Sequence, residues 1–127
     1  MVNHKSWNND PLLELSVSQA GWQPLTFVVE NNRIFTSYYR LRPSGAYEDR
    51  VETILTEQEF QRISELLSAV INDYYYAIDN WLPRDHGSEW FTLKHNGYTY
   101  VDENAVHVSL LRLHDELRRL SLLRLPR

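Results

Sequence analysis

The chain has 127 residues, the usual length of a single domain with its own hydrophobic core. It contains no cysteine, which excludes disulfide bonds, thiolate nucleophiles and cysteine-ligated zinc sites. The 17 acidic and 13 basic residues give a formal net charge of -4, and this charge disfavours a general nucleic-acid binder, because such proteins neutralise phosphates. We therefore expect no nucleic-acid partner.

No apolar run approaches the roughly 18 residues that span a bilayer, and the N-terminus lacks the apolar stretch of a signal peptide. We therefore expect a cytoplasmic protein with no membrane partner. Residues 1–10 are polar and are predicted to form a flexible N-terminal arm, whereas residues 11–127 are predicted to form a single α+β domain.

The first half of the domain alternates apolar and polar residues in the way that is typical of strands. Asn31 and Asn32 tolerate positive φ and separate two of these segments, which predicts a hairpin with a two-residue turn. The four predicted strands, which we expect to form an antiparallel meander, cover residues 13–17, 25–30, 33–41 and 50–54.

A long helix is predicted to follow the fourth strand. Thr56 and Glu59 form a capping box, while Leu55 and Phe60 occupy the two positions of a hydrophobic staple. Pro83 is expected to end this helix, unless the preceding Asp-Asn pair ends it earlier. The apolar stripe of this helix contains Phe60, Ile63, Leu67, Val70, Tyr74 and Trp81.

A hairpin is predicted over residues 89–102, where an Asn-Gly pair separates two alternating runs. A two-residue turn pairs His95 with Tyr98 and therefore Leu93 with Tyr100. The face expected to join the core contains Phe91, Leu93, Tyr98 and Tyr100, and the other face contains Trp90, Thr92, Thr99 and Val101.

A second helix is predicted to begin at a cap on Asp102 or Asn104 and to run to about Leu122. Leu111 and Leu122 lie well outside its apolar stripe, so a second element or a second copy of the chain is expected to cover them. The stripe itself contains Val106, Leu110, Leu113, Leu117 and Leu120.

The elements follow the order ββββ-α-ββ-α. The sequence therefore predicts an α+β domain in which two long helices pack on one face of an antiparallel sheet. The order of the elements leaves open whether the first four strands and the late hairpin form one sheet or two.

Because no cysteine is present, histidines would have to dominate any transition-metal site. His107 and His114 lie seven residues apart on the flank of the predicted last helix, and we interpret them as hydrogen-bonded residues at the edge of the core rather than as metal ligands. The chain carries no catalytic, phosphate-binding or metal-binding motif, so we expect neither a metal nor a cofactor.

The densest group of potential proton-transfer residues contains Asp79, Asp85, His86 and Glu89. An acid beside a histidine can orient it as a general base, but Gly87 disfavours the regular helix that would make the spacing meaningful. We interpret the group as charged loop residues that favour solubility, and keep a small enzyme or ligand-binding domain as an alternative.

Aromatic residues make up 13% of the chain, and the positions of several of them indicate a binding surface. Because consecutive helical side chains are 100° apart, one helix cannot bury Tyr74, Tyr75 and Tyr76 together. Tyr74 falls on the apolar stripe, Tyr75 on its edge, and Tyr76 points away from it. The predicted partner-binding residues are Tyr75, Tyr76, Asp79, Trp81, Asp85 and Trp90. In the alternative interpretation these residues form no binding surface. Trp90 then lies in the core, and the Tyr76 hydroxyl forms a hydrogen bond with a loop.

An acidic, aromatic-rich domain suits a protein that binds and occludes a basic partner, because negative charge speeds association and aromatic anchors slow release. We therefore predict a small non-enzymatic protein-binding domain, of which an immunity or antitoxin-like inhibitor of a basic toxin or enzyme is one form. The alternatives are an enzyme or ligand-binding domain using Asp79, Asp85 and His86, and a homodimeric structural subunit closed by Leu111 and Leu122.

Overall fold

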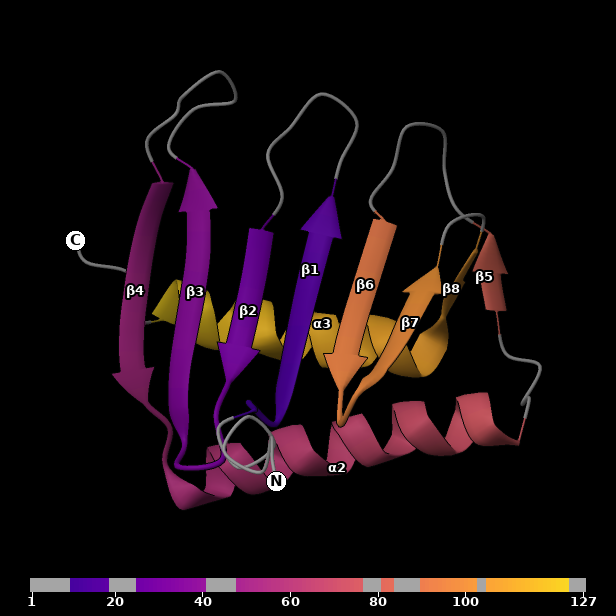
Figure 1. The fold of residues 1–127 in the computed structure, drawn as a ribbon, viewed down its shortest axis with the longest axis horizontal. Coiled ribbons are helices and arrows are strands. Elements are labelled where there is room, and N and C mark those ends of the chain that lie inside the picture. Colours follow the sequence, from indigo (N-terminus) through magenta and orange to yellow (C-terminus); the bar gives the residue numbers. More distant parts are fainter. Residues whose placement is uncertain are drawn as a thin grey trace, which may run out of the picture.

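The computed structural model describes residues 10–18, 25–40, 48–76, 81–83, 90–102 and 105–123. Six strands form one antiparallel sheet in the order β4-β3-β2-β1-β6-β7, and two long helices lie together on one face of it (Figure 1). The predicted fold class and the order of its main elements are therefore confirmed. Of the predicted N-terminal arm, only Asp10 lies within the described residues.

The strands of the main sheet are β1 (Leu13–Ser18), β2 (Leu25–Val29), β3 (Ile34–Arg40), β4 (Glu48–Ile54), β6 (Trp90–His95) and β7 (Tyr98–Asp102). Two short strands, β5 (Trp81–Pro83) and β8 (Ala105–His107), pair with each other in a separate ribbon. The helices are α2 (Glu57–Tyr75) and α3 (Val108–Leu123).

The central strand β1 joins the early meander to the late hairpin. Leu15 lies opposite Phe27 of β2 on one side and opposite Leu93 of β6 on the other, and all three side chains are buried. Leu13 and Val17 face the helices in the same way, while Glu14 and Ser16 alternate onto the other face. The two groups of strands therefore share one sheet and one core.

The core lies between the sheet and the two helices. It joins buried residues of β1, β2, β3 and β6 to one stripe on each helix, as binary patterning predicts. Its largest fully buried side chains are Phe27, Phe35, Phe91, Leu13, Leu15, Leu55, Ile63, Leu93, Leu110, Leu113, Leu117 and Leu120.

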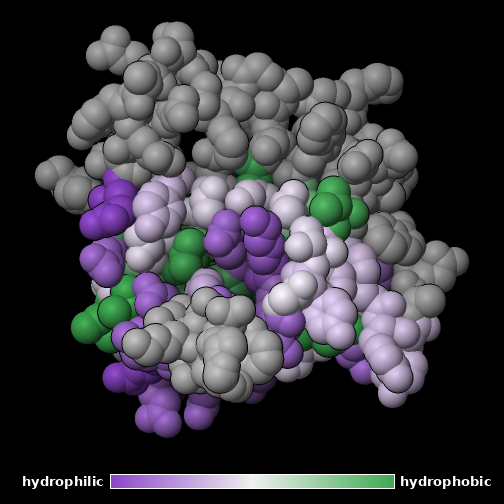
Figure 2. Space-filling view, in the orientation of Figure 1, coloured by the Kyte–Doolittle hydropathy of each residue, from purple (hydrophilic) through white to green (hydrophobic). Residues whose placement is uncertain are grey.

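The other face of the sheet carries hydroxyl and charged side chains. Ser16 lies opposite Thr26 and Thr92, and the Ser16 and Thr26 hydroxyl oxygens are 3.2 Å apart. Glu14 lies opposite Lys94 in the next row. Figure 2 shows this face, on which pale and purple residues outnumber green ones. Alternation along the strands thus gives the sheet one apolar and one polar face.

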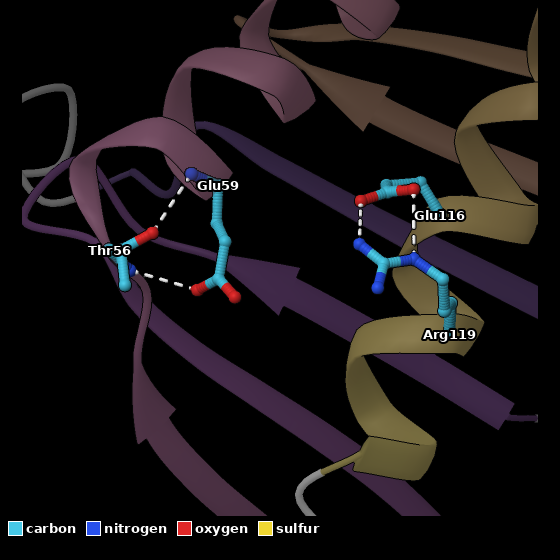
Figure 3. Close-up of polar contacts among 4 residues, drawn as sticks. All are labelled: Thr56, Glu59, Glu116 and Arg119. Atoms are coloured by element: carbon cyan, nitrogen blue, oxygen red, sulfur yellow. Dashed lines mark hydrogen bonds and ion pairs between the residues drawn. The ribbon is translucent and has the colours of Figure 1, made fainter.

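The start of α2 is fixed by the predicted capping box (Figure 3). The Glu59 backbone N–H donates to Thr56 Oγ1 at 3.1 Å, and the Thr56 backbone N–H donates to Glu59 Oε1 at 2.9 Å. Leu55 is buried and Phe60 packs against the core, as expected for a hydrophobic staple.

The end of α2 differs from the prediction. The helix ends at Tyr75, and Trp81, which was expected on its apolar stripe, lies in β5 opposite His107 of β8. The residues at the end of α2 are weak helix formers, namely Asn72, Asp73 and three consecutive tyrosines. Trp81 instead pairs with β8. The apolar periodicity of α2 thus extends along the sequence as far as Trp81, although the helix itself ends at Tyr75.

The start of α3 also differs from the prediction. Val106 was expected on the helical stripe but lies in β8, and the helix begins only at Val108. His107 precedes the helix, and its Nδ1 accepts a hydrogen bond from the Ser109 backbone N–H at 3.3 Å. His107 therefore caps the helix in place of the expected Asp102 or Asn104.

Near its other end, α3 carries an ion pair between Glu116 and Arg119 (Figure 3). Arg119 Nη2 donates to Glu116 Oε2 at 2.6 Å, and Arg119 Nε donates to Glu116 Oε1 at 3.3 Å. These hydrogen bonds raise the pKa of Arg119, and the charge of Glu59 acts in the same direction. The end of α3 thus lies within electrostatic reach of the first turn of α2.

The β6–β7 hairpin has the predicted register, with His95 opposite Tyr98 and Leu93 opposite Tyr100. Asn96 and Gly97 have φ values of 52° and 83°, as a type I′ turn requires. Tyr98, however, was predicted in the core and is 66% exposed. It lies beside the turn on β7, an outer strand of the sheet.

The β2–β3 turn is longer than the predicted two-residue turn. The positive φ, 74°, belongs to Arg33 rather than to either asparagine. The Arg33 N–H donates to the Glu30 carbonyl at 2.9 Å, and Asn32 Oδ1 accepts from the Ile34 N–H at 3.3 Å. A tight turn followed by one left-handed residue therefore joins these strands.

Candidate protein-binding site

The three consecutive tyrosines at the end of α2 divide between the core and the surface. Tyr74 is half-buried and packs against the core, with its ring centroid 4.9 Å from that of Tyr100. Tyr75 is 78% exposed and Tyr76 is 64% exposed. Tyr74 therefore packs against the core and Tyr76 lies on the surface, as predicted. Tyr75 is more exposed than its predicted position at the edge of the stripe implies.

The two exposed rings support each other. Their centroids are 4.8 Å apart and their planes are nearly perpendicular, at 89°, which is a favourable edge-to-face arrangement. Tyrosine has only two side-chain torsions, so ordering such a pair on binding costs little entropy. We call Tyr75 and Tyr76 the tyrosine pair.

The helix end that carries the tyrosine pair is attached to the rest of the molecule. Asp73 Oδ2 lies 3.5 Å from His107 Nδ1, and the Ser109 hydroxyl oxygen lies 2.9 Å from the same nitrogen. His107 is only 1% exposed, and its ring also lies 5.8 Å from that of Tyr74. The ring contact between Tyr74 and His107, together with the hydrogen bond from the Ser109 N–H to His107, holds the end of α2 near β8 and the start of α3.

Among the described residues, those next to the tyrosine pair favour positive charge. The last turn of α2 contains no basic residue, so the partial negative charge of its C-terminal carbonyl groups is not neutralised from within the helix. Asp73 adds a carboxylate whose side chain is 21% exposed. Tyrosine faces attract cations as well, so the helix end suits an arginine or lysine side chain.

The other predicted site residues are placed only in part. Trp81 in β5 lies opposite His107, which also contacts Tyr74, so its backbone is at the same end of the molecule as the tyrosine pair. Trp90 begins β6 opposite Ser18 of β1. The structure does not describe the side chains of Trp81 and Trp90, and Asp79 and Asp85 lie outside the described residues.

The proposed catalytic group is likewise not described, because His86 and Glu89 lie outside the same ranges. Within the described parts of the chain, no three histidine, aspartate or glutamate side chains form a group that could hold a metal ion. No helix within these parts is long and apolar enough to cross a membrane.

The structure also contains a hollow that the sequence did not predict. It has a volume of about 510 Å³ and lies where the start of β1 meets the β2–β3 and β6–β7 turns. His95 Nδ1 lies 2.7 Å from the Leu12 carbonyl oxygen, and the Asn31 side-chain amide donates to the Asp10 carbonyl at 3.1 Å. The Asn-rich turns were visible in the sequence, but their meeting depends on the strand order.

Comparison of the chain with models of known protein families found no match, and comparison with curated protein sequences found none either.

Proposed function

We propose that this protein is a small binding domain that attaches to a basic partner protein through the tyrosine pair and occludes part of its surface. The observation that carries this proposal is the perpendicular, exposed pair of rings at the anchored end of α2. Tyrosines in such positions provide large contact areas at low entropic cost and are frequent hot spots of protein interfaces.

The charge of the chain supports a basic partner. The 17 acidic residues against 13 basic ones would accelerate association with a positively charged surface. Close to the rings, the carbonyl end of α2 and Asp73 favour a cationic side chain. An inhibitor of a basic toxin or enzyme, of the immunity or antitoxin type, is one protein that would use such a site.

The proposal is tested by comparing proteins captured on the immobilised wild type with those captured on a Tyr75→Ala, Tyr76→Ala double variant. We expect at least one basic protein to be retained by the wild type and lost from the double variant. Its purified form should bind the wild type roughly 1,000-fold more tightly, since two hot-spot side chains that contribute about 2 kcal/mol each lower the binding free energy by about 4 kcal/mol.

Tyr98→Ala provides the matched control, because Tyr98 is 66% exposed, like Tyr76, but lies on β7 beside the hairpin turn. This variant should retain the partner. If the double variant captured every protein that the wild type captures, with equal affinity, the tyrosine pair would not be the binding site.

A further inference from the structure

Two hollows lie at the end of the sheet where β1 begins and where β2 and β6 end (Figure 1). The larger has a volume of about 510 Å³ and the smaller about 340 Å³, and both are lined by Asp10, Pro11, Asn96 and Gly97. Sites for small ligands usually measure about 300–1,000 Å³, so each hollow is large enough for one. We call the two together the turn hollow.

The chain segment that borders the turn hollow is held in place by hydrogen bonds from distant parts of the sequence. The Asn31 side-chain amide donates to the Asp10 carbonyl at 3.1 Å, and His95 Nδ1 lies 2.7 Å from the Leu12 carbonyl oxygen. Residues 10–12 are therefore attached to the β2–β3 turn and to the end of β6. A site that is ordered in this way before a ligand arrives loses little entropy on binding.

The same hydrogen bonds determine which polar atoms the larger hollow offers to a ligand. A carbonyl oxygen can only accept, so His95 Nδ1 carries the proton and Nε2 of the neutral ring is an acceptor. Asn31 donates through its side-chain nitrogen, which leaves its side-chain oxygen as a second acceptor. Asp10 contacts Asn31 through its backbone, so its exposed carboxylate is a third acceptor.

Hydrogen-bond donors lie beside these acceptors. Asn96 is exposed and lines both hollows, and its side-chain amide has two N–H groups. Lys94 lines the smaller hollow and lies opposite Glu14 of β1. The lining thus contains two carboxylates, those of Asp10 and Glu14, and one ammonium group, so neither sign of charge dominates. This balance favours a neutral polar ligand over a strongly charged one.

The turn hollow also offers apolar surface. Tyr98 lines the smaller hollow and is 66% exposed, and Pro11 lines both hollows. An exposed aromatic ring presents a flat face against which C–H groups can pack. There is space for a ligand over the turn itself, because a Cβ atom added to Gly97 would have no neighbour within 4 Å.

We propose that the turn hollow binds a carbohydrate. A sugar ring carries hydroxyl groups at its edge, each of which both donates and accepts, and C–H groups on its faces. The hydroxyl groups complement the acceptors of His95 and Asn31 and the donors of Asn96. The C–H groups complement the exposed ring of Tyr98. A monosaccharide or a disaccharide suits the volume of the two hollows.

This inference does not depend on the proposed function, because the two sites belong to different elements. The residues that line the turn hollow lie in the ranges 10–14 and 94–99 and at Asn31, whereas the tyrosine pair lies at the end of α2. The Tyr75→Ala, Tyr76→Ala double variant should therefore keep its affinity for the carbohydrate while losing the basic partner. Failure of one proposal would leave the other standing.

Nuclear magnetic resonance titration of the isotopically labelled full chain tests the site. The probes are glucose, galactose, N-acetylglucosamine, cellobiose and lactose, each added up to about 100 mM. We expect at least one of them to shift the backbone amide signals of Asn96 and Gly97, which lie at the turn between the hollows. The dissociation constant should be about 10 mM or lower, as is usual for a ligand of this size.

Two substitutions remove ligand contacts from exposed positions. Asp10→Ala removes the carboxylate but keeps the backbone carbonyl that Asn31 contacts, and Tyr98→Ala removes the ring. Each should raise the dissociation constant about tenfold or more. Glu52→Ala is the matched control, because it removes an exposed carboxylate from β4 at the opposite edge of the sheet, and it should leave the constant unchanged. Circular dichroism checks the fold of each variant.

Spermidine serves as a cationic probe, because acceptors outnumber donors in the larger hollow. Shifts of the Asn96 and Gly97 signals with spermidine but with none of the five sugars would assign the site to cations and overturn the inference. It would equally be overturned if no sugar shifted these signals at about 100 mM, or if a sugar bound Asp10→Ala and Tyr98→Ala as tightly as the wild type.

Discussion

At the scale of single residues, the start of α2 is held by two reciprocal hydrogen bonds of the capping box (Figure 3). Thr56→Ala removes the hydroxyl acceptor and leaves the Glu59 N–H to water, so the free energy of unfolding should fall by about 1 kcal/mol. Thr56→Ser keeps the acceptor and should cost much less. Urea unfolding of the three proteins measures both effects, and equal losses for alanine and serine would show that the hydrogen bond is unimportant.

The tyrosine pair also belongs to the residue scale. The 100° step of a helix predicts the exposure of Tyr76 from the sequence alone, although the helix itself ends one residue earlier, at Tyr75. The anchoring of the same helix end could not be predicted, because the His107 ring meets Tyr74 only after β8 and α3 have formed. The sequence therefore indicates which rings are exposed but not how firmly they are held.

At the scale of elements, α3 has one buried and one exposed face. Leu117→Ala should lower the free energy of unfolding by about 2–5 kcal/mol, because Leu117 is fully buried in the core. Leu122→Ala, at a position that is 53% exposed, should cost less than about 1 kcal/mol. Both variants replace leucine with alanine in the same helix, so the difference between their losses of stability on thermal unfolding reports the difference in burial. Similar losses would mean that Leu122 is covered in solution.

Elements with strong local signals could be predicted, and those that depend on distant partners could not. Alternation in β1, the capping box of α2 and the Asn-Gly turn of β6–β7 each act within about ten residues. The strands β5 and β8 have three residues each and exist through their mutual pairing. Their apolar residues continue the helical period, so the sequence pattern predicts helix at Trp81 and Val106, where the structure has strands.

Exposure along an element depends on the position of that element in the fold. Tyr98 and Tyr100 share a face of β7, yet Tyr98 is exposed while Tyr100 packs against the core. Alternation identifies the face but not how much of each side chain the rest of the fold covers, so the prediction for Tyr98 was wrong. Leu111 shows the reverse case, since it lies outside the predicted stripe and still packs against the core.

At the scale of the whole molecule, β1 connects parts of the chain that are distant in sequence. It pairs with β2, about ten residues away, and with β6, about 80 residues away. The early meander cannot form the complete core alone, because Phe91 and Leu93 of β6 and the stripe of α3 complete it. A sheet shared in this way predicts a single cooperative unfolding transition for the described domain.

Leu15→Ala tests this cooperativity, since Leu15 lies opposite both Phe27 and Leu93 and is fully buried. We expect a loss of about 2–5 kcal/mol, with far-UV circular dichroism and tryptophan fluorescence following the same urea transition, because the meander and the hairpin lose the same central contact. Val101→Ala on the outer strand β7, where the side chain is 50% exposed, should cost less than about 1 kcal/mol. Two separated transitions in Leu15→Ala would instead mean that the meander with α2 and the hairpin with α3 unfold as independent units.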